Sequence, residues 1–188
     1  LASGNEFDSI CIPVSPILLV QEDFIDQVKR VIETYQIPEG KLALEVDDTA
    51  LSSVYLNVNI TMQELYDMGV ELVMNNFGSG CAPVTSILDL PVNTVKLERM
   101  FVWQLETNPK SAHIINGLVQ IAKHLELNII AEGVTENQLN ALNSYECEYQ
   151  QGFYYAPTME FDVLKKVLGT TLDESRVTIE EEKLKMKR

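Results

Sequence analysis

The sequence predicts an α/β fold in which parallel strands alternate with helices. Short apolar runs with strand character alternate with amphipathic stretches along the 188 residues, and this alternation is typical of parallel β/α units. Polar residues recur at the carboxyl ends of the apolar runs, where parallel folds build their sites. No internal repeat or low-complexity linker interrupts the pattern, and a hydrophobic fraction of 46% allows a sizeable core.

The elements follow from residue spacing. The expected strands are Ile10–Val14, Leu42–Val46, Val70–Met74, Thr94–Leu97, Asn128–Ala131 and Gly152–Tyr155. Two intervening stretches carry apolar residues at three- and four-residue spacing, which predicts helices with one core-facing side: Phe24, Val28, Val31 and Tyr35 in the first, and Ile114, Leu118, Ile121 and Leu125 in the second. Helix stops or starts are expected at Gly40, Gly69 and Asn108-Pro109.

The pattern changes after Leu168, so we expect one domain over residues 1–168 and a charged helix or tail over residues 169–188. Acidic residues precede basic ones in the final run, an order that suits the helix dipole. A solvated terminal helix or frayed tail is the simpler interpretation, and a partner-docking helix is the alternative.

Composition limits the possible partners. A net charge of −14 opposes binding to nucleic-acid polymers. No apolar run approaches the roughly 20 residues that span a bilayer, and the first residues lack a signal-peptide pattern. We therefore expect a cytoplasmic protein with no membrane span in this chain.

Polar residues mark the same end of successive expected strands. In a parallel β/α barrel these ends converge on one face, where active sites are built. Any one of these residues alone is more often a solvated or capping residue, but their recurrence favours a shared site. The residues are Glu45, Asn75, Asn76, Lys96, Glu132 and Gln151, the last just before the final apolar run.

Five motifs carry a family resemblance. They are Leu44-Glu45-Val46-Asp47-Asp48, the run NNFGSG from Asn75, the run LPVNTVKLE from Leu90, Ala131-Glu132-Gly133-Val134 and the run QGFYYAP from Gln151. In type and order they resemble the EAL family, which contains the bacterial cyclic di-GMP phosphodiesterases, over about Ile10 to Leu168. The resemblance implies a modified (β/α) TIM-type barrel that uses two Mg²⁺ or Mn²⁺ ions to activate water and cleave cyclic di-GMP to linear pGpG.

The resemblance also assigns expected roles to particular positions. Glu45 matches a metal-binding glutamate, Lys96 the lysine near the attacking water and Glu132 another acidic site residue. Gln151 matches the glutamine that closes the pocket, and Asp48 stands for a glutamate that orders an active-site loop. These positions are the expected remnant of the family's site.

Other positions depart from the family pattern. Pro13 stands where the family has a metal-binding asparagine, Asn75 and Asn76 replace an aspartate pair, and Thr135 replaces the second glutamate of an EGVE motif. Amide oxygens can coordinate a hard cation but do not neutralise it. The family's first strand, with its Glu-Ala-Leu signature, a metal-binding Glu and a nearby phosphate-contacting Arg, is absent from these 188 residues. We therefore expect no intact catalytic set, no bound metal and a barrel that lacks its N-terminal strand, either in a fragment or in an open barrel prone to dimerise.

Two functional classes remain for such a degenerate domain. The first is a signalling domain that acts through protein contacts, with a protein partner or a second copy of the chain. The second is a receptor that binds cyclic di-GMP without cutting it. The first is preferred at this point, because Lys96 is the only evident cation among the matched positions. An active phosphodiesterase is the least favoured, since the loss of even one electrostatic group can cost 10²–10³ in rate.

Overall fold

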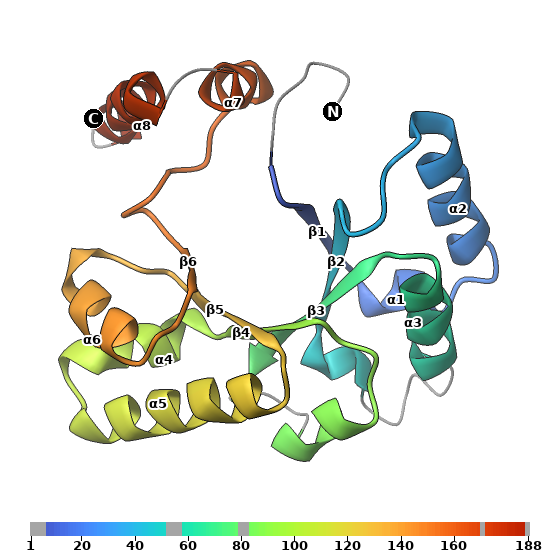
Figure 1. Cartoon of the computed structure of the whole chain (residues 1–188), viewed down its shortest axis with the longest axis horizontal. Coiled ribbons are helices and arrows are strands. Elements are labelled where there is room, and N and C mark those ends of the chain that lie inside the picture. Colours follow the sequence, from blue (N-terminus) through green and yellow to red (C-terminus); the bar gives the residue numbers. More distant parts are fainter. Residues whose placement is uncertain (1–6, 52–57, 79–82, 170–171, 187–188) are drawn as a thin grey trace.

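The computed structural model describes residues 7–51, 58–78, 83–169 and 172–186. Within them, six strands form one sheet in chain order, and every neighbouring pair is parallel. Figure 1 shows the sheet curled, with most helices on its outer side. This confirms the prediction of parallel β/α units in a barrel-type arrangement. The strands are β1 Ile10–Val14, β2 Leu42–Asp47, β3 Glu71–Phe77, β4 Thr94–Leu97, β5 Asn128–Glu132 and β6 Tyr149–Gln151.

The helices begin largely at recognisable sequence signals. The side chain of Asn108 accepts a hydrogen bond from the Lys110 N–H at 3.0 Å, and Pro109 occupies the first helical position, as expected. The α-helices are α1 Pro16–Leu19, α2 Phe24–Tyr35, α3 Val58–Asp67, α4 Arg99–Trp103, α5 Pro109–His124, α6 Leu139–Ser144, α7 Phe161–Leu168 and α8 Leu172–Met186. The short 3₁₀ helices are η1 Asp48–Leu51, η2 Val84–Leu88, η3 Gln104–Glu106 and η4 Glu136–Gln138.

The main core lies between the sheet and the helices around it. Alternate strand residues such as Leu44, Leu72, Val95 and Ile129 are buried there. Because side chains alternate across a strand, the intervening residues line the concave side of the sheet. The polar positions predicted from the sequence therefore lie on the concave side, away from the main core.

The predicted core faces of two helices are partly wrong. In α5, Leu118 is buried as expected, but Ile114, Ile121 and the C-cap residue Leu125 are exposed. The helix instead buries a face shifted by about one residue that includes Ile115. In α2, Phe24 and Val28 are buried, whereas Val31 and Tyr35 are exposed. Both stretches hold adjacent apolar residues, so spacing alone does not select the face that meets the sheet.

The last strand also differs from its prediction. It comprises Tyr149–Gln151 rather than Gly152–Tyr155, because Tyr149 and Gln151 pair with Ile130 and Glu132 of β5. Residues 152–155 form a turn, with the Tyr155 N–H donating to the Gly152 carbonyl at 3.0 Å. Pairing with β5, rather than the aromatic character of the next residues, sets this strand.

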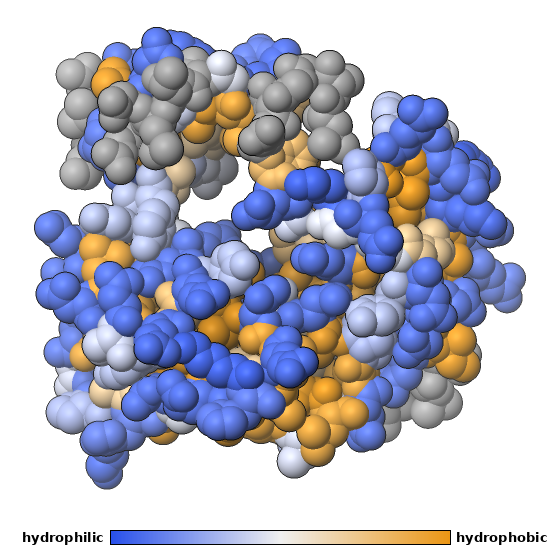
Figure 2. Space-filling model, in the orientation of Figure 1, coloured by the Kyte–Doolittle hydropathy of each residue, from blue (hydrophilic) through white to orange (hydrophobic). Residues whose placement is uncertain are grey.

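The C-terminal helices lie at the margin of the body. Figure 2 shows an opening between the α7–α8 region and the rest of the molecule. Lys183 of α8 donates a hydrogen bond to the Tyr154 carbonyl at 2.7 Å. A helix thus occupies most of the charged segment predicted over 169–188, while the division into separate units remains a prediction. In the part of the chain that the structure describes, every helix is too short or too polar to cross a membrane.

Candidate functional site

The strand register brings the predicted site positions to one edge of the sheet. Pro13 of β1 pairs with Glu45 of β2. Farther along β2, Asp47 pairs with Asn75 of β3. On the other side of the sheet, Glu132 of β5 pairs with Gln151 of β6. All of these lie toward the carboxyl ends of their strands, the face on which barrel enzymes build sites.

Glu45 and Lys96 form an ion pair inside this face. Lys96 Nζ lies 2.5 Å from Glu45 Oε2, and the two side chains are only 6% and 13% exposed. The Cys11 thiol donates a weaker hydrogen bond to the same carboxylate oxygen at 3.8 Å. Partial burial, and then the nearby Glu45 carboxylate, raise the pKa of Cys11 to about 11. The carboxylate of Glu45, one of the retained acidic positions, is therefore already paired with a cation of the protein itself.

Asn75 and Asn76 lie at a β-bulge. Met74 pairs with Val95 and Phe77 with Leu97, so two residues of β3 stand opposite Lys96 alone. Asn76 has φ +60°, a left-handed conformation that Asn adopts more readily than most residues. Consequently both amides line the same cavity, although successive strand residues normally face opposite sides.

The amide pair is held locally and by a neighbouring acid. Asn75 Oδ1 accepts the Asn76 backbone N–H at 2.9 Å, and Asn76 Nδ2 donates to Asp47 Oδ2 at 2.7 Å. The other oxygen of Asp47 accepts the Thr49 N–H at 3.0 Å. The next residue, Asp48, is buried where η1 begins. Asp47, the last residue of β2, thus holds both the loop and the bulge.

Arg99 and Trp103 are site residues that the sequence analysis missed. Arg99 Nη2 lies 3.3 Å from Glu132 Oε1, and its guanidinium carbon lies 5.7 Å from the centre of the Trp103 ring. The indole N–H of Trp103 donates to the Gly133 carbonyl at 2.8 Å. Both residues come from α4, directly after β4, in a stretch that reads as an ordinary solvated helix. The one available signal was their position just beyond the carboxyl end of the strand that carries Lys96.

Two adjoining cavities meet at this cluster. One, of about 350 Å³, is lined by Arg99, Trp103 and Glu132 together with the Asn75–Asn76 pair. The other, of about 480 Å³, has the same first three residues in its wall and extends toward β6. The lining of this larger cavity includes an arginine and an indole, which are suitable groups for a ligand that is both planar and anionic.

Two more predicted positions, Thr135 and Gln151, line the larger cavity. The Thr135 hydroxyl and N–H contact Gln138 Oε1 at 2.6 and 2.8 Å in a capping box at the start of η4. The Gln151 carbonyl accepts the Val134 N–H at 3.0 Å, and its side chain is exposed. Thr135 therefore has a structural role in this chain where the family pattern has an acid.

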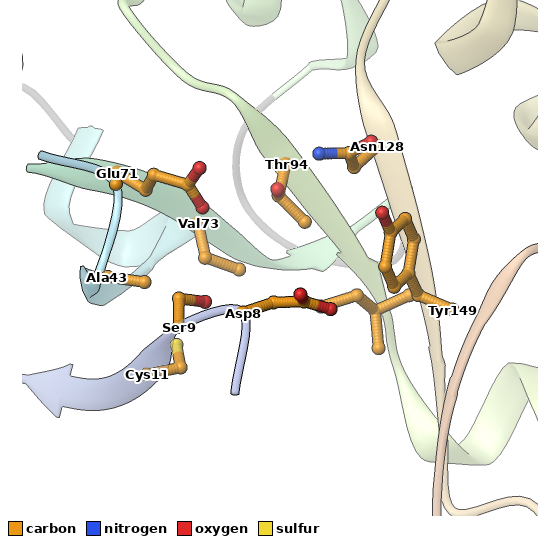
Figure 3. A pocket seen from close by; sticks show the side chains of 11 residues that line it. Asp8, Ser9, Cys11, Ala43, Glu71, Val73, Thr94, Asn128 and Tyr149 are labelled. Carbon is orange, nitrogen blue, oxygen red and sulfur yellow. The ribbon is translucent and has the colours of Figure 1, made fainter. Parts of the chain in front are cut away.

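A separate pocket of about 160 Å³ lies toward the amino ends of the strands. Figure 3 shows Thr94 and Tyr149 on one side of it and Ser9, Cys11 and Ala43 on the other. It contains none of the site positions predicted from the sequence. The cavities that do contain them are the two that meet at Arg99.

The residues present do not suit a two-metal centre. Among the described residues, no three His, Cys, Asp or Glu side chains form a group that could hold a metal ion. Glu45 is paired with Lys96 and Glu132 with Arg99, and the amides between them bring no negative charge. Mg²⁺ and Mn²⁺ prefer sites rich in carboxylates, so the donor set differs from the one that the family resemblance implies.

Comparison with curated sequences shows where the chain has relatives. Over 153 residues it is 27% identical to the probable cyclic di-GMP phosphodiesterase PdeG of Escherichia coli, covering 80% of this chain and 30% of PdeG. Over 160 residues it is 26% identical to the cyclic di-GMP phosphodiesterase RocR of Pseudomonas aeruginosa, covering 85% of this chain and 41% of RocR. The chain therefore spans less than half the length of either relative.

Solved structures and a family profile give the same family. The EAL domain of Mycobacterium smegmatis DcpA is similar with a TM-score of 0.80 and 28% identity, over 86% of this chain and 73% of that one. The MucR phosphodiesterase in complex with c-di-GMP has a TM-score of 0.77 and 26% identity, over 83% of this chain and 64% of that one. The profile of the EAL domain matches residues 2–158. On this evidence, the chain belongs to the EAL domain family.

Proposed function

We propose that this chain is a catalytically inactive EAL domain that takes part in cyclic di-GMP signalling by binding the nucleotide without cleaving it. The observation that carries the inactivity is the ion pair between Glu45 and Lys96, which is largely excluded from water. With Asn75 and Asn76 in place of two acids, the remaining groups supply too little negative charge for a pair of divalent ions.

Nucleotide binding is supported by the cavity at Arg99. The preference for protein contacts, as drawn from the sequence, rested on Lys96 as the sole cation of the site, and the side chain of Lys96 is 6% exposed and paired. Arg99 adds a second cation, whose side chain is 56% exposed. The similar MucR phosphodiesterase has been solved in complex with c-di-GMP, which makes this nucleotide the first ligand to test.

A signalling domain that acts through protein contacts is the second candidate. It is favoured by exposed apolar side chains on β1 and α1, namely those of Ile10, Ile12 and Ile17. Within the described strands, β1 pairs only with β2, so its other edge can accept a partner segment or a second copy of the chain. The cytoplasmic location expected from the sequence remains a prediction.

Calorimetric titration with cyclic di-GMP, with and without excess Mn²⁺, tests the proposal when the same samples are then chromatographed for pGpG. Binding without product is the expected result. Product formation would contradict the inactivity, and an absence of binding would favour the protein-contact candidate. The variant Asn75→Asp/Asn76→Asp should also form no pGpG, because Glu45 stays paired with Lys96 and Pro13 offers no ligand.

A further inference from the structure

The larger cavity has a cation that can be released at little cost. In the ion pair between Arg99 and Glu132, Nη2 and Oε1 lie 3.3 Å apart, and the Arg99 side chain is 56% exposed. Exposed pairs of this kind contribute little to stability, because water screens them. A ligand phosphate is a suitable replacement partner, because its oxygens accept the two parallel N–H bonds of a guanidinium as a carboxylate does.

The stem of Arg99 is positioned by a glycine. A Cβ atom on Gly133 would lie 2.3 Å from Arg99 Cγ, so the arginine stem lies directly against the Gly133 backbone. Trp103 is fixed at the same point, because its indole N–H donates to the Gly133 carbonyl. The guanidinium end can therefore change partner while its stem and the neighbouring ring stay in place.

We infer that Arg99 is the phosphate anchor of this site, that Trp103 is the surface on which a nucleobase packs, and that Glu132 opposes binding as the internal counter-ion of Arg99. This inference rests on the proposed function, which it refines to particular groups. It assigns Glu132 a role opposite to that of a metal ligand: the carboxylate must give up Arg99 before an anion can bind. Binding then needs no divalent cation.

Trp103 provides a direct measurement, because it is the only tryptophan among the 188 residues. Cyclic di-GMP and, separately, GMP are titrated into the full chain in a buffer with EDTA, while indole emission and heat are both recorded. We expect quenching of the emission together with binding heat. Arg99→Ala should weaken binding about tenfold to a hundredfold, the usual range for a hydrogen bond to a charged group.

The decisive variant is Glu132→Gln, which keeps the shape of the side chain and removes its charge. It should tighten binding by roughly threefold to tenfold, since it removes both the competitor for Arg99 and a like charge facing the ligand. Lys165→Ala is the matched control. Lys165 is 53% exposed and paired with Asp162 at 3.5 Å, and its ammonium lies 5.2 Å from the Phe161 ring centre, but it lines neither cavity. This control should bind as the unmodified chain does.

The outcomes separate the two proposals. Binding heat with cyclic di-GMP, but unchanged emission or an unchanged affinity in Arg99→Ala, overturns the assignment and leaves the proposed function intact. Weaker binding in Glu132→Gln, at an unchanged melting temperature, likewise overturns the competitor role. If GMP quenches the emission and cyclic di-GMP does not, the subsite is supported and the cyclic di-GMP proposal is overturned. If neither nucleotide produces binding heat or quenching, the residue assignment and the proposed function are both overturned.

Discussion

Removal of Lys96 should destabilise the fold through the charge that it leaves behind. In Lys96→Met, the carboxylate of Glu45, only 13% exposed, loses the ammonium at 2.5 Å and keeps only a weak thiol donor at 3.8 Å. Breaking a buried pair typically costs 3–5 kcal/mol. Because Glu45 retains some contact with water, we expect the lower end, about 3 kcal/mol. For a chain of this size that corresponds to a fall in melting temperature of roughly 6–12 °C.

Urea unfolding followed by far-ultraviolet circular dichroism measures this loss. The control is the double variant Glu45→Leu/Lys96→Met, which removes both charges and fills similar volume. It should be at least about 1 kcal/mol more stable than Lys96→Met, and with the single variant Glu45→Leu it completes a cycle that gives the coupling energy of the pair. A loss below about 0.5 kcal/mol in Lys96→Met, or strictly additive effects in the double variant, would refute the buried-pair argument.

The remaining predictions concern a thiol, the bulge and a glycine. Cys11, whose pKa lies at about 11 instead of 9.0, should react with iodoacetamide at pH 8 roughly a hundredfold more slowly than an ordinary thiol. The variant Glu45→Gln should speed this reaction, and peptide-resolved mass spectrometry measures both rates. The raised pKa of Cys11 disfavours the thiolate in the folded state. The protonated thiol therefore contributes fully to the free energy of unfolding below pH 9, and denaturation curves should show this contribution falling as the pH rises toward 11. Asn76→Val should be about 1–2 kcal/mol less stable than Asn76→Gly, since both lose the amide and only valine is strained at φ +60°; equal stabilities would contradict the left-handed conformation. Gly133→Ala should cost about 1–2 kcal/mol, because φ is +78° and the new Cβ meets Arg99, and a neutral effect on the unfolding midpoint would count against that packing.

The sequence predicted the sheet better than it predicted the helix faces. Strands β1, β2, β4 and β5 were correct to within a residue, because their short length and the residues that bound them favour a strand over a helix. β6 was misplaced, since the aromatic run after Gln151 is as strand-like by propensity as Tyr149, and pairing with β5 decides which residues form the strand. The burial of Ile115 instead of Ile114 reflects a helix rotation that spacing cannot fix.

The sequence predicted which positions lie at the site but not which side chains contact one another there. Strand phasing alone placed Glu45, Lys96 and Glu132 at one edge of the sheet. Their partners could not be predicted, because an ion pair depends on side-chain reach and on which cation is nearest in space. Arg99 was missed for this reason: from the start of α4 it meets Glu132 at the end of β5, and the sequence separates the two by more than thirty residues.

At the β-bulge of Asn75 and Asn76, the backbone shape of the site and the charge of its side chains have different sequence requirements. An extra residue in β3 directs two consecutive side chains to one cavity, and the left-handed position at Asn76 is accessible to aspartate as well as asparagine. Replacing asparagine with aspartate exchanges a nitrogen for an oxygen and leaves the backbone requirement unchanged, but at position 76 it removes the amide donor that Asp47 accepts. Acidic character can therefore be gained or lost at this point by single substitutions while the bulge keeps directing both side chains to the cavity, so that the charge of the site and its shape vary separately.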